Sequence, residues 1–296
     1  MFKFSIIIPT YNRAHTIERP LNSLVRQTFK NFEVVVVDDG SIDNTEEIVL
    51  PYISTLQLKY IKKNNGGKHT ALNRGIKESN GELMVILDSD DEFYDDTLEQ
   101  MNCVWDNQIE KDDLCGLMFR CSERDKLIGN LFPDDIYKMS YIEFHYGKYG
   151  GSFKDCCECV RLDILKEYSW PENLDTKFIP ENYVFDQIGL KYKLLCYNKI
   201  LEKKVYYAND GITLNNDAYI KKNFAGYLFN IVSKVDIIVP NSNEISLRRK
   251  IAIWEEYWTF VKNDIDGIGI RTKKVTLLGV LAYLKIIIKT ILNKNC

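Results

Sequence analysis

The sequence lacks an excess of either charge, a long apolar run and a cysteine pattern typical of a disulfide framework. Its 39 Lys and Arg residues nearly balance its 42 Asp and Glu residues, which argues against a general nucleic-acid binder because such a protein needs a basic field. No run reaches the roughly 18 uncharged apolar residues of a membrane-spanning helix, and no secretory leader is expected because the apolar run of residues 4–8 ends at Pro9. Three of the eight cysteines lie within residues 156–159, but no second Cys/His pair stands at zinc-site spacing, so we expect reduced thiols in a cytoplasmic protein.

The near balance of charge hides an uneven distribution along the chain. Residues 271–296 hold six cationic side chains and no acidic one, so the total of −3 leaves −9 on the first 270 residues. Residues 274–293 predict a helix about 30 Å long, with Lys274, Lys285 and Lys289 on a narrow stripe among Val, Leu and Ile. Two interpretations stay open: an in-plane helix that contacts anionic lipid, or a helix buried against the body or a second protomer.

The first hundred residues alternate short apolar runs with segments of helical spacing. Continuously apolar, β-branched runs such as 33–37 are typical of a parallel sheet covered on both faces. The alternation therefore predicts an α/β fold with a doubly wound sheet. We expect strands at 4–8, 33–37, 56–61, 83–87, 114–121 and 156–160, and helices at 14–28, 68–79, 97–108, 183–193, 224–238 and 245–260.

Three of the expected strands end in polar segments, at the edge of the sheet where parallel α/β folds bind ligands. They are PTYNR at 9–13, DDGS at 38–41 and DSDD at 88–91. Each segment alone is common in turns and helix caps. Together they bring carboxylates to one edge, where these repel one another unless a cation is present, and Mg²⁺ or Mn²⁺ prefers oxygen ligands and bridges to substrate phosphates. We therefore predict a site for a metal-bound nucleotide diphosphate.

The polar segments are part of a longer series of motifs in the first hundred residues. The series consists of FSIIIPTYNR at 4–13, QTF at 27–29, VVDDGS at 36–41, NRGI at 73–76, NGE at 80–82 and LDSDD at 87–91. It resembles the signature of family 2 glycosyltransferases. The resemblance implies a GT-A-like fold, a Rossmann-type doubly wound mixed sheet followed by C-terminal helices. It divides the chain into a nucleotide-sugar (donor) half at 1–121, an acceptor-binding half at 122–215 and a C-terminal helical region at 216–296.

The resemblance also implies which residues bind the nucleotide. Tyr11, two residues after Pro9 in the donor-binding segment, would stack on the base. Asp39 would accept a hydrogen bond from the uracil N3–H, which favours a UDP-sugar as the donor.

The Asp-x-Asp motif and a nearby lysine would hold the diphosphate. Asp90 matches the residue that contacts Mn²⁺ or Mg²⁺ in the family, and Asp88 matches the one near the ribose or the metal, with Ser89 between them in the donor site. Lys68 would meet the diphosphate as a point charge, or it would lie at a solvated helix start.

An inverting transferase also needs a carboxylate that takes the proton from the acceptor hydroxyl. The best match to the family's acidic motif is FIPENYVFD at 178–186, in which Glu181 and Asp186 are the catalytic candidates. Many relatives have Glu-Asp where this chain has Glu181 and Asn182, so the second acid is missing. Glu181 could instead cap the following helix.

These observations predict an inverting, metal-dependent glycosyltransferase. It would move a sugar from a UDP-sugar to a hydroxyl of a glycan or lipid-linked acceptor, in surface or capsular polysaccharide synthesis. We expect it in the cytoplasm, peripheral on the inner face of the cell membrane, with a homo-oligomer left open. Two alternatives remain: a catalytically inactive nucleotide-sugar-binding subunit, which Asn182 favours, and a sugar nucleotidyltransferase, which would need a glycine-rich phosphate loop after the first strand.

Overall fold

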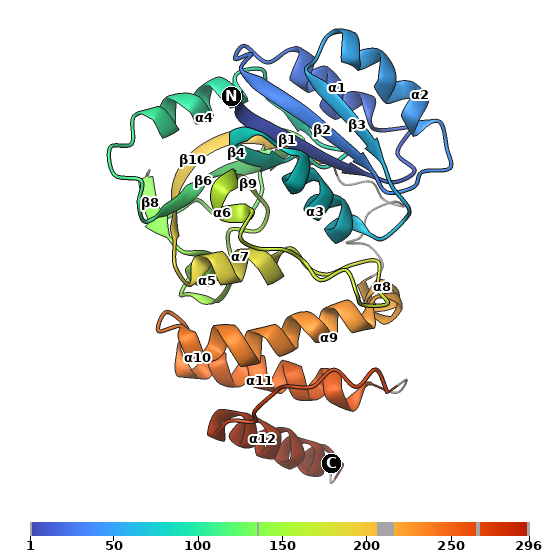
Figure 1. The fold of residues 1–296 in the computed structure, drawn as a ribbon. Coiled ribbons are helices and arrows are strands. Elements are labelled where there is room, and N and C mark those ends of the chain that lie inside the picture. The colour runs from blue at the N-terminus through green and yellow to red at the C-terminus, as the bar shows by residue number, and fades with distance from the viewer. Residues whose placement is uncertain (1, 135, 206–215, 265–266, 295–296) are drawn as a thin grey trace.

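The computed structural model describes residues 2–134, 136–205, 216–264 and 267–294. A mixed sheet with helices on both faces forms the upper part of the molecule in Figure 1, and the C-terminal helices lie in layers below it. The strands are β1 (Phe2–Thr10), β2 (Phe32–Asp38), β3 (Leu58–Lys62), β4 (Gly81–Ile86), β5 (Glu92–Phe93), β6 (Leu114–Glu123), β7 (Lys126–Leu127), β8 (Ile136–Met139), β9 (Cys156–Arg161) and β10 (Lys193–Lys203). The helices are α1 (Glu18–Val25), α2 (Thr45–Val49), α3 (Lys68–Glu78), α4 (Thr97–Asp106), α5 (Tyr141–Tyr146), α6 (Leu162–Leu165), α7 (Asn182–Gly189), α8 (Asn216–Lys222), α9 (Phe224–Ser233), α10 (Val239–Asn241), α11 (Leu247–Lys262) and α12 (Leu277–Lys294).

The described strands form one sheet in the order β3-β2-β1-β4-β9-β6-β10-β5, with β7 on β6 and β8 on β10. β3, β2, β1 and β4 are parallel, β9 is antiparallel to both β4 and β6, and β10 is parallel to β6. The predicted doubly wound mixed sheet is confirmed. Because β6 and β10 run in the same direction as β4, the carboxyl ends of β1, β2, β4 and β10 open toward one edge.

The two faces of β1 enter two different apolar cores. Ile6 and Ile8 pack in a cluster that includes Trp105 of α4, whereas Ile7 packs on the other face with Leu72 of α3. All three isoleucines are fully buried. The continuous apolar character of the strand therefore reflects helices on both faces of the sheet.

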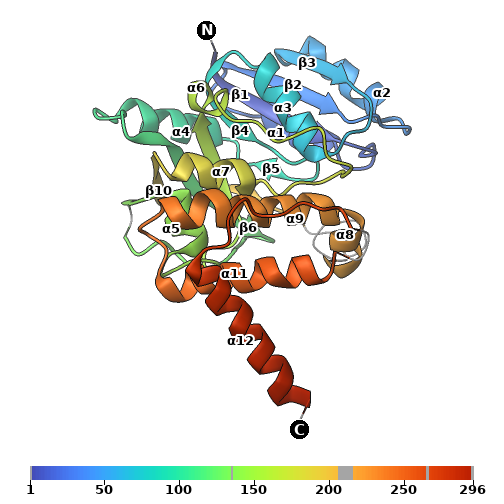
Figure 2. The same cartoon turned by 60° about the horizontal axis from the view of Figure 1, so that its bottom comes forward.

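The C-terminal helices form a third apolar cluster, to which α9 contributes Leu228 and α11 contributes Trp254 and Tyr257. α12 docks on α11 at Gly279, where an added Cβ would lie 2.9 Å from Trp254 Cε3. Trp258 Nε1 also donates a hydrogen bond to the Gly279 carbonyl at 2.8 Å. From this contact α12 projects away from the body (Figure 2). Among the described residues, the structure contains no helix with the length and apolar character needed to cross a membrane.

Several elements differ from the sequence-based expectation. The first helix begins at Glu18 rather than at residue 14, because Arg13–Ile17 form a turn in which Ile17 N donates to Arg13 O at 2.9 Å. The helix expected over 183–193 ends at Gly189, and the chain then enters β10. β10 was not predicted, because a register shift between Cys196 and Ile200 interrupts its alternation of apolar and polar residues.

Candidate active site

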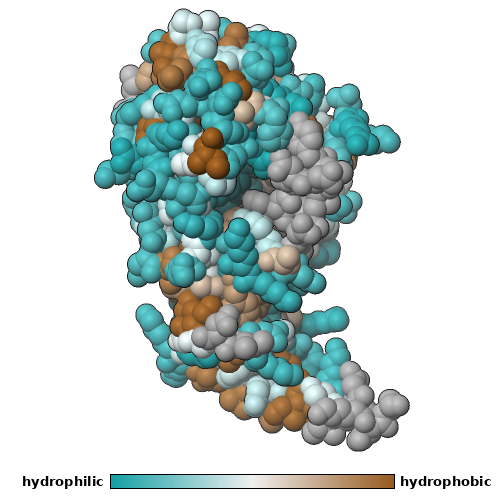
Figure 3. All heavy atoms as spheres, turned by 90° about the vertical axis from the view of Figure 1, so that its right-hand side faces the viewer, coloured by the Kyte–Doolittle hydropathy of each residue, from teal (hydrophilic) through white to brown (hydrophobic). Residues whose placement is uncertain are grey.

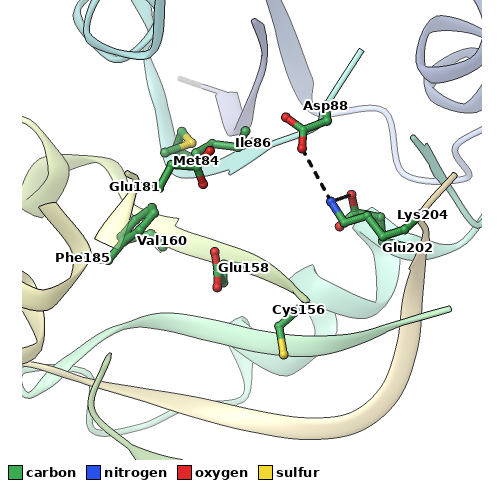
Figure 4. A pocket seen from close by; sticks show the side chains of 10 residues that line it. All are labelled: Met84, Ile86, Asp88, Cys156, Glu158, Val160, Glu181, Phe185, Glu202 and Lys204. Atoms are coloured by element: carbon green, nitrogen blue, oxygen red, sulfur yellow. Dashed lines mark ion pairs between the residues drawn. The ribbon is translucent and has the colours of Figure 1, made fainter. Parts of the chain in front are cut away.

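A pocket lies beyond the carboxyl end of β4, between β9, the end of β10 and the start of α7. The pocket is small, with a volume of about 50 Å³, and it is partly open to solvent. Four of the side chains that line it carry carboxyl groups and one is a lysine (Figure 4). The lining residues are Met84, Ile86, Asp88, Cys156, Glu158, Val160, Glu181, Phe185, Glu202 and Lys204.

Lys68 connects two predicted site residues that are far apart in the sequence. Its Nζ lies 2.6 Å from Asp88 Oδ1 and 2.7 Å from Glu181 Oε1. Glu181 precedes α7 but makes no capping hydrogen bond with its side chain. Burial alone would raise the pKa of Asp88, but Lys68 and Lys204 outweigh it and lower that pKa to about 2. Asp88 therefore stays ionised at neutral pH.

Lys204 is the second cation of the pocket and was not predicted. Its Nζ lies 2.8 Å from Asp91 Oδ2, 2.9 Å from Glu202 Oε1 and 3.8 Å from Asp88 Oδ2. Asp91 also accepts a hydrogen bond from Val205 N at 2.9 Å. Asp91 thus ties the end of β10 to the Asp-x-Asp loop.

The predicted metal ligand Asp90 keeps an available carboxylate, which forms no hydrogen bond or ion pair with the described residues. Its backbone carbonyl accepts a hydrogen bond from Arg19 Nη1 at 2.9 Å, and the adjacent Ser89 is buried. Burial and the charge of Asp88 raise the pKa of Asp90. Within the described ranges, no three His, Cys, Asp or Glu side chains gather as a metal site. Mg²⁺ is commonly held by one or two carboxylates together with substrate phosphates, so Asp90 and Asp88 fit a cation that binds with a diphosphate.

The predicted nucleotide-binding residues lie on adjacent loops at the ends of β1 and β2. Tyr11 is 46% exposed, whereas Pro9 is buried within β1. The backbone N–H of Asp39 donates to the Thr10 carbonyl at 2.8 Å, which joins the two loops. The exposed ring of Tyr11 and the buried side chain of Asp39 thus lie on two loops that are joined to each other.

The Asp39 carboxylate is held by the loop before α3. Its Oδ1 accepts from Lys63 Nζ at 2.6 Å and Gly66 N at 2.8 Å, and its Oδ2 accepts from Gly67 N at 2.6 Å. Oδ2 retains a lone pair for one further donor, such as an imide N–H. Gly67 has a φ of +98°, and an added Cβ would lie 1.9 Å from the Lys177 carbonyl oxygen, so the loop requires glycine here.

Asp186, the other catalytic candidate, does not line the pocket. Its Oδ1 lies 2.6 Å from His145 Nδ1, and its Oδ2 accepts hydrogen bonds from Tyr146 OH at 2.6 Å and Asn182 Nδ2 at 3.4 Å. Asn182, at the position where many relatives have a second acid, in turn accepts a hydrogen bond from Asn230 Nδ2 at 3.0 Å. Asp186 is 1% exposed and joins α5 to α7.

Glu158 lines the pocket and was also missed. It lies on β9 and forms no hydrogen bond or ion pair with any residue that the structure describes. Burial and the charge of Glu181 raise the pKa of Glu158 to about 8, although Lys204 opposes the shift. The segment 156–159 stands out in the sequence for its three thiols. The informative signal is Glu158, an acid within a short apolar strand.

Comparison with known proteins identifies the family of the chain. The model of the family described as Glycosyl transferase family 2 matches residues 5–152, half of the chain. The chain belongs to glycosyltransferase family 2. The matched region contains Tyr11, Asp39, Lys68 and the Asp-x-Asp motif, and the predicted resemblance is confirmed.

Curated family members match about a third of the chain. An uncharacterized glycosyltransferase of Rickettsia conorii is 42% identical over 97 residues, which cover 33% of this chain and 16% of that protein. The poly(ribitol-phosphate) β-N-acetylglucosaminyltransferase TarS of Staphylococcus aureus is 45% identical over 103 residues, which cover 33% of this chain and 18% of TarS. The match thus spans less than a fifth of either relative.

Solved structures of glycosyltransferases share the fold over most of the chain. S. aureus TarS 1–349 in complex with UDP-GlcNAc has a TM-score of 0.61 at 21% identity, covering 95% of this chain and 79% of that one. The mannosyltransferase PcManGT of Pyrobaculum calidifontis, in complex with GDP-Man and Mn²⁺, has a TM-score of 0.53 at 18% identity. The match covers 86% of this chain and 69% of PcManGT. Both likenesses support the GT-A-type fold of this family 2 chain.

The raised pKa of Glu158 predicts a pH-dependent contribution to stability. The folded protein keeps this proton up to a pH of about 8, whereas the unfolded chain releases it near the ordinary value of 4.5. The contribution is therefore fully present below about pH 4.5 and is lost as the pH rises through 8. The melting temperature of Glu158→Gln should therefore rise above that of wild type as the pH increases from 5 to 8. Since 1 kcal/mol corresponds to roughly 2–4 °C, the difference at pH 8 should be several times that size. Differential scanning fluorimetry measures this; a difference in melting temperature that is constant with pH contradicts it.

Proposed function

We propose that this chain is an inverting glycosyltransferase that moves a sugar from a UDP-sugar to a hydroxyl of a glycan or lipid-linked acceptor, in the synthesis of a surface polysaccharide. The observation that carries the proposal is Lys68, which holds Asp88 of the Asp-x-Asp motif and Glu181 at one pocket. Asp88, on the donor side of the reaction, and Glu181, on the acceptor side, are thereby both bound to the same ammonium group. The family membership supports the reaction class, and the structures of TarS with UDP and with UDP-GlcNAc support the choice of donor.

The nucleotide binds at the loops that follow β1 and β2. Tyr11 offers an exposed ring for stacking on the base, with Pro9 beneath the same loop. Asp39 Oδ2, held in place by Gly67 N, accepts the uracil N3–H. The diphosphate then lies toward Ser89 and Lys68, near the first turn of α3.

Asp90 and Asp88 would hold a Mg²⁺ or Mn²⁺ ion that arrives with the diphosphate. When bound, such an ion neutralises negative charge on the leaving diphosphate. Lys68 and Lys204 contribute positive charge at the same edge of the pocket from the chain itself.

Glu181 takes the proton in the transfer step. The acceptor oxygen attacks the anomeric carbon and forms the new glycosidic bond, while the bond from that carbon to the phosphate oxygen breaks and its electron pair leaves with UDP. The proton of the acceptor hydroxyl moves to the Glu181 carboxylate, which lies in the pocket. Asp186 has hydrogen-bonding partners at both carboxylate oxygens, so we assign it the positioning of α7 rather than proton transfer.

The assignment of the base predicts different effects for the two acids. Glu181→Gln should lower kcat for UDP release by about 10²-fold or more, because the amide cannot accept the proton, while calorimetric binding of UDP should persist. Asp186→Asn, which keeps the shape of the side chain, should act mainly on stability. A turnover of Glu181→Gln equal to wild type, or a larger loss of kcat in Asp186→Asn, contradicts the assignment. UDP binding by wild type with no transfer to any acceptor would instead favour the inactive partner subunit.

The metal assignment has a separate test. Asp90→Asn should raise the Mn²⁺ concentration needed for half-maximal UDP release by about tenfold or more, because a charged ligand is lost. Isothermal titration of Mn²⁺ in the presence of UDP provides a second readout that does not depend on turnover. Unchanged turnover and unchanged metal affinity in this variant would overturn the assignment.

We also infer that α12 lies on the surface of an anionic membrane. One side of α12 docks on α11, where Ala282 is fully buried, and Lys285 pairs with Glu255 at 2.5 Å. The opposite side exposes a continuous apolar stripe, and Figure 3 shows apolar surface on this lowest part of the molecule. The exposed side chains are Leu277, Val280, Leu281, Leu284, Ile287 and Ile288.

The charge of this region supports a lipid partner over an unspecified protein. Lys273, Lys274 and Lys289 are exposed in this region, and residues 271–296 contain no acidic side chain. An apolar stripe bordered by lysines is typical of helices that lie in the plane of an anionic bilayer. A location at the inner face of the membrane would place the pocket near lipid-linked acceptors.

Vesicle binding tests the membrane inference. Leu284→Ser/Ile288→Ser should weaken cosedimentation with phosphatidylglycerol-containing vesicles by about tenfold or more, because two apolar side chains no longer enter the bilayer. The matched control Ile53→Ser/Ile109→Ser removes two exposed apolar side chains elsewhere and should bind as wild type. Absence of vesicle binding by wild type, or a dimer in light scattering that the first variant disrupts, would contradict the lipid assignment.

A further inference from the structure

We propose that Glu158 forms a hydrogen bond to the sugar ring of the donor and thereby contributes to sugar specificity. The proposal rests on the proposed function, since it places the transferred sugar in the pocket between Asp88 and Glu181. Neither the motifs of the sequence nor the comparisons assign a role to this residue.

The position of Glu158 follows from the alternation of β9. Cys157 and Cys159 point to one face of the sheet and are buried in the apolar cluster that includes α4. Cys156, Glu158 and Val160 point to the other face and line the pocket. β9 lies between β4 and β6 in the sheet, so Glu158 stands on the floor of the pocket and not on its rim.

Glu158 is the pocket acid without a cation. Asp88 and Glu181 share Lys68, and Glu202 pairs with Lys204 at 2.9 Å. Figure 4 shows Glu158 between Val160 and Cys156, with no ion pair drawn to it. Among the described residues the carboxyl group of Glu158, which is partly exposed, has neither a hydrogen-bond partner nor a salt bridge, so it is available to a ligand.

The surroundings of Glu158 select an uncharged ligand that carries hydroxyl groups. Glu158 has no ion-pair partner among the described residues and brings no positive charge that would attract an anionic diphosphate, whereas a sugar ring carries no charge. With a pKa of about 8, the carboxyl group is largely protonated at neutral pH, so its O–H can donate while its carbonyl oxygen accepts. A sugar hydroxyl or an acetamido group supplies both partners.

Calorimetry with UDP and with UDP-sugars separates a contact to the sugar from a contact to the nucleotide. UDP, UDP-GlcNAc, UDP-glucose and UDP-galactose are titrated into wild type with Mn²⁺, and the sugar nucleotide that binds most tightly is kept. Glu158→Met, similar in length but apolar, should weaken binding of that sugar nucleotide by about tenfold and leave the affinity for UDP unchanged. Glu158→Gln, which retains a donor and an acceptor, should keep most of the affinity.

A matched control and a second variant keep the outcome clear. Glu123→Met removes an acid at the end of β6 in the same sheet, outside the pocket lining, and should bind both ligands as wild type. If Glu158→Met does not fold, as judged by circular dichroism, Glu158→Ala replaces it.

The remaining outcomes overturn the inference in distinguishable ways. Unchanged affinity of Glu158→Met for the sugar nucleotide would show that Glu158 does not contact the sugar, while the proposed function stands. Equal losses for UDP and for the sugar nucleotide would show a general effect on the pocket. If wild type binds neither UDP nor any UDP-sugar, the proposed function fails and the inference fails with it.

Discussion

The bridge from Lys68 to both Asp88 and Glu181 is the interaction on which the rest of the site depends. These two carboxylates come from opposite sides of the pocket, and they would repel each other without the ammonium group between them. The three side chains are partly exposed, and ion pairs that solvent reaches contribute little net stability because water and salt screen their attraction. The main effect of the bridge is therefore to fix the position of α7 relative to β4, and its contribution to the free energy of folding is small.

The second lysine extends the same principle to the end of β10. Lys204 neutralises Asp91 and Glu202, so the carboxylates around the Asp-x-Asp loop are balanced by cations from two different segments of the chain. Glu158 and Asp90 are left out of this balance. Among the described residues neither carboxyl group has a partner, so both are available to a ligand. Their surroundings differ, because Glu158 adjoins apolar side chains whereas Asp90 lies next to Asp88. One environment suits an uncharged sugar and the other suits a cation.

The parts of the site that could be predicted are those encoded by local sequence. Tyr11, Asp39 and Asp88 each follow a continuously apolar strand, and strand and polar end are read together from a single segment. The strands β1, β2, β3 and β4 were predictable for the same reason. Glu158 and Lys204 could not be found in this way, because their meaning depends on β9 and β10 pairing with strands that are distant in sequence.

Two predicted residues show how tertiary contacts decide between roles that the sequence leaves open. Glu181 and Asp186 lie on the same short segment, the first just before α7 and the second in the middle of it. Glu181 faces Lys68, whereas Asp186 faces His145 and Tyr146 on α5. The sequence does not encode which side of α7 would meet which neighbour, since no helix or strand was expected between residues 121 and 156, where α5 lies.

The C-terminal helices also belong to the site, through the segment that leads into Glu181. Lys177 N donates a hydrogen bond to Asn223 Oδ1 at 3.1 Å, and Gly226 of α9 lies so close to Phe178 that an added Cβ would be 1.9 Å from its carbonyl oxygen. On the other side, Lys177 packs against Gly67, which holds Asp39. The segment before Glu181 is thus confined between α9 and the nucleotide-binding loop. A helical layer outside the region matched by the family model therefore helps to set the distance between the nucleotide-binding loops and the acid at the start of α7.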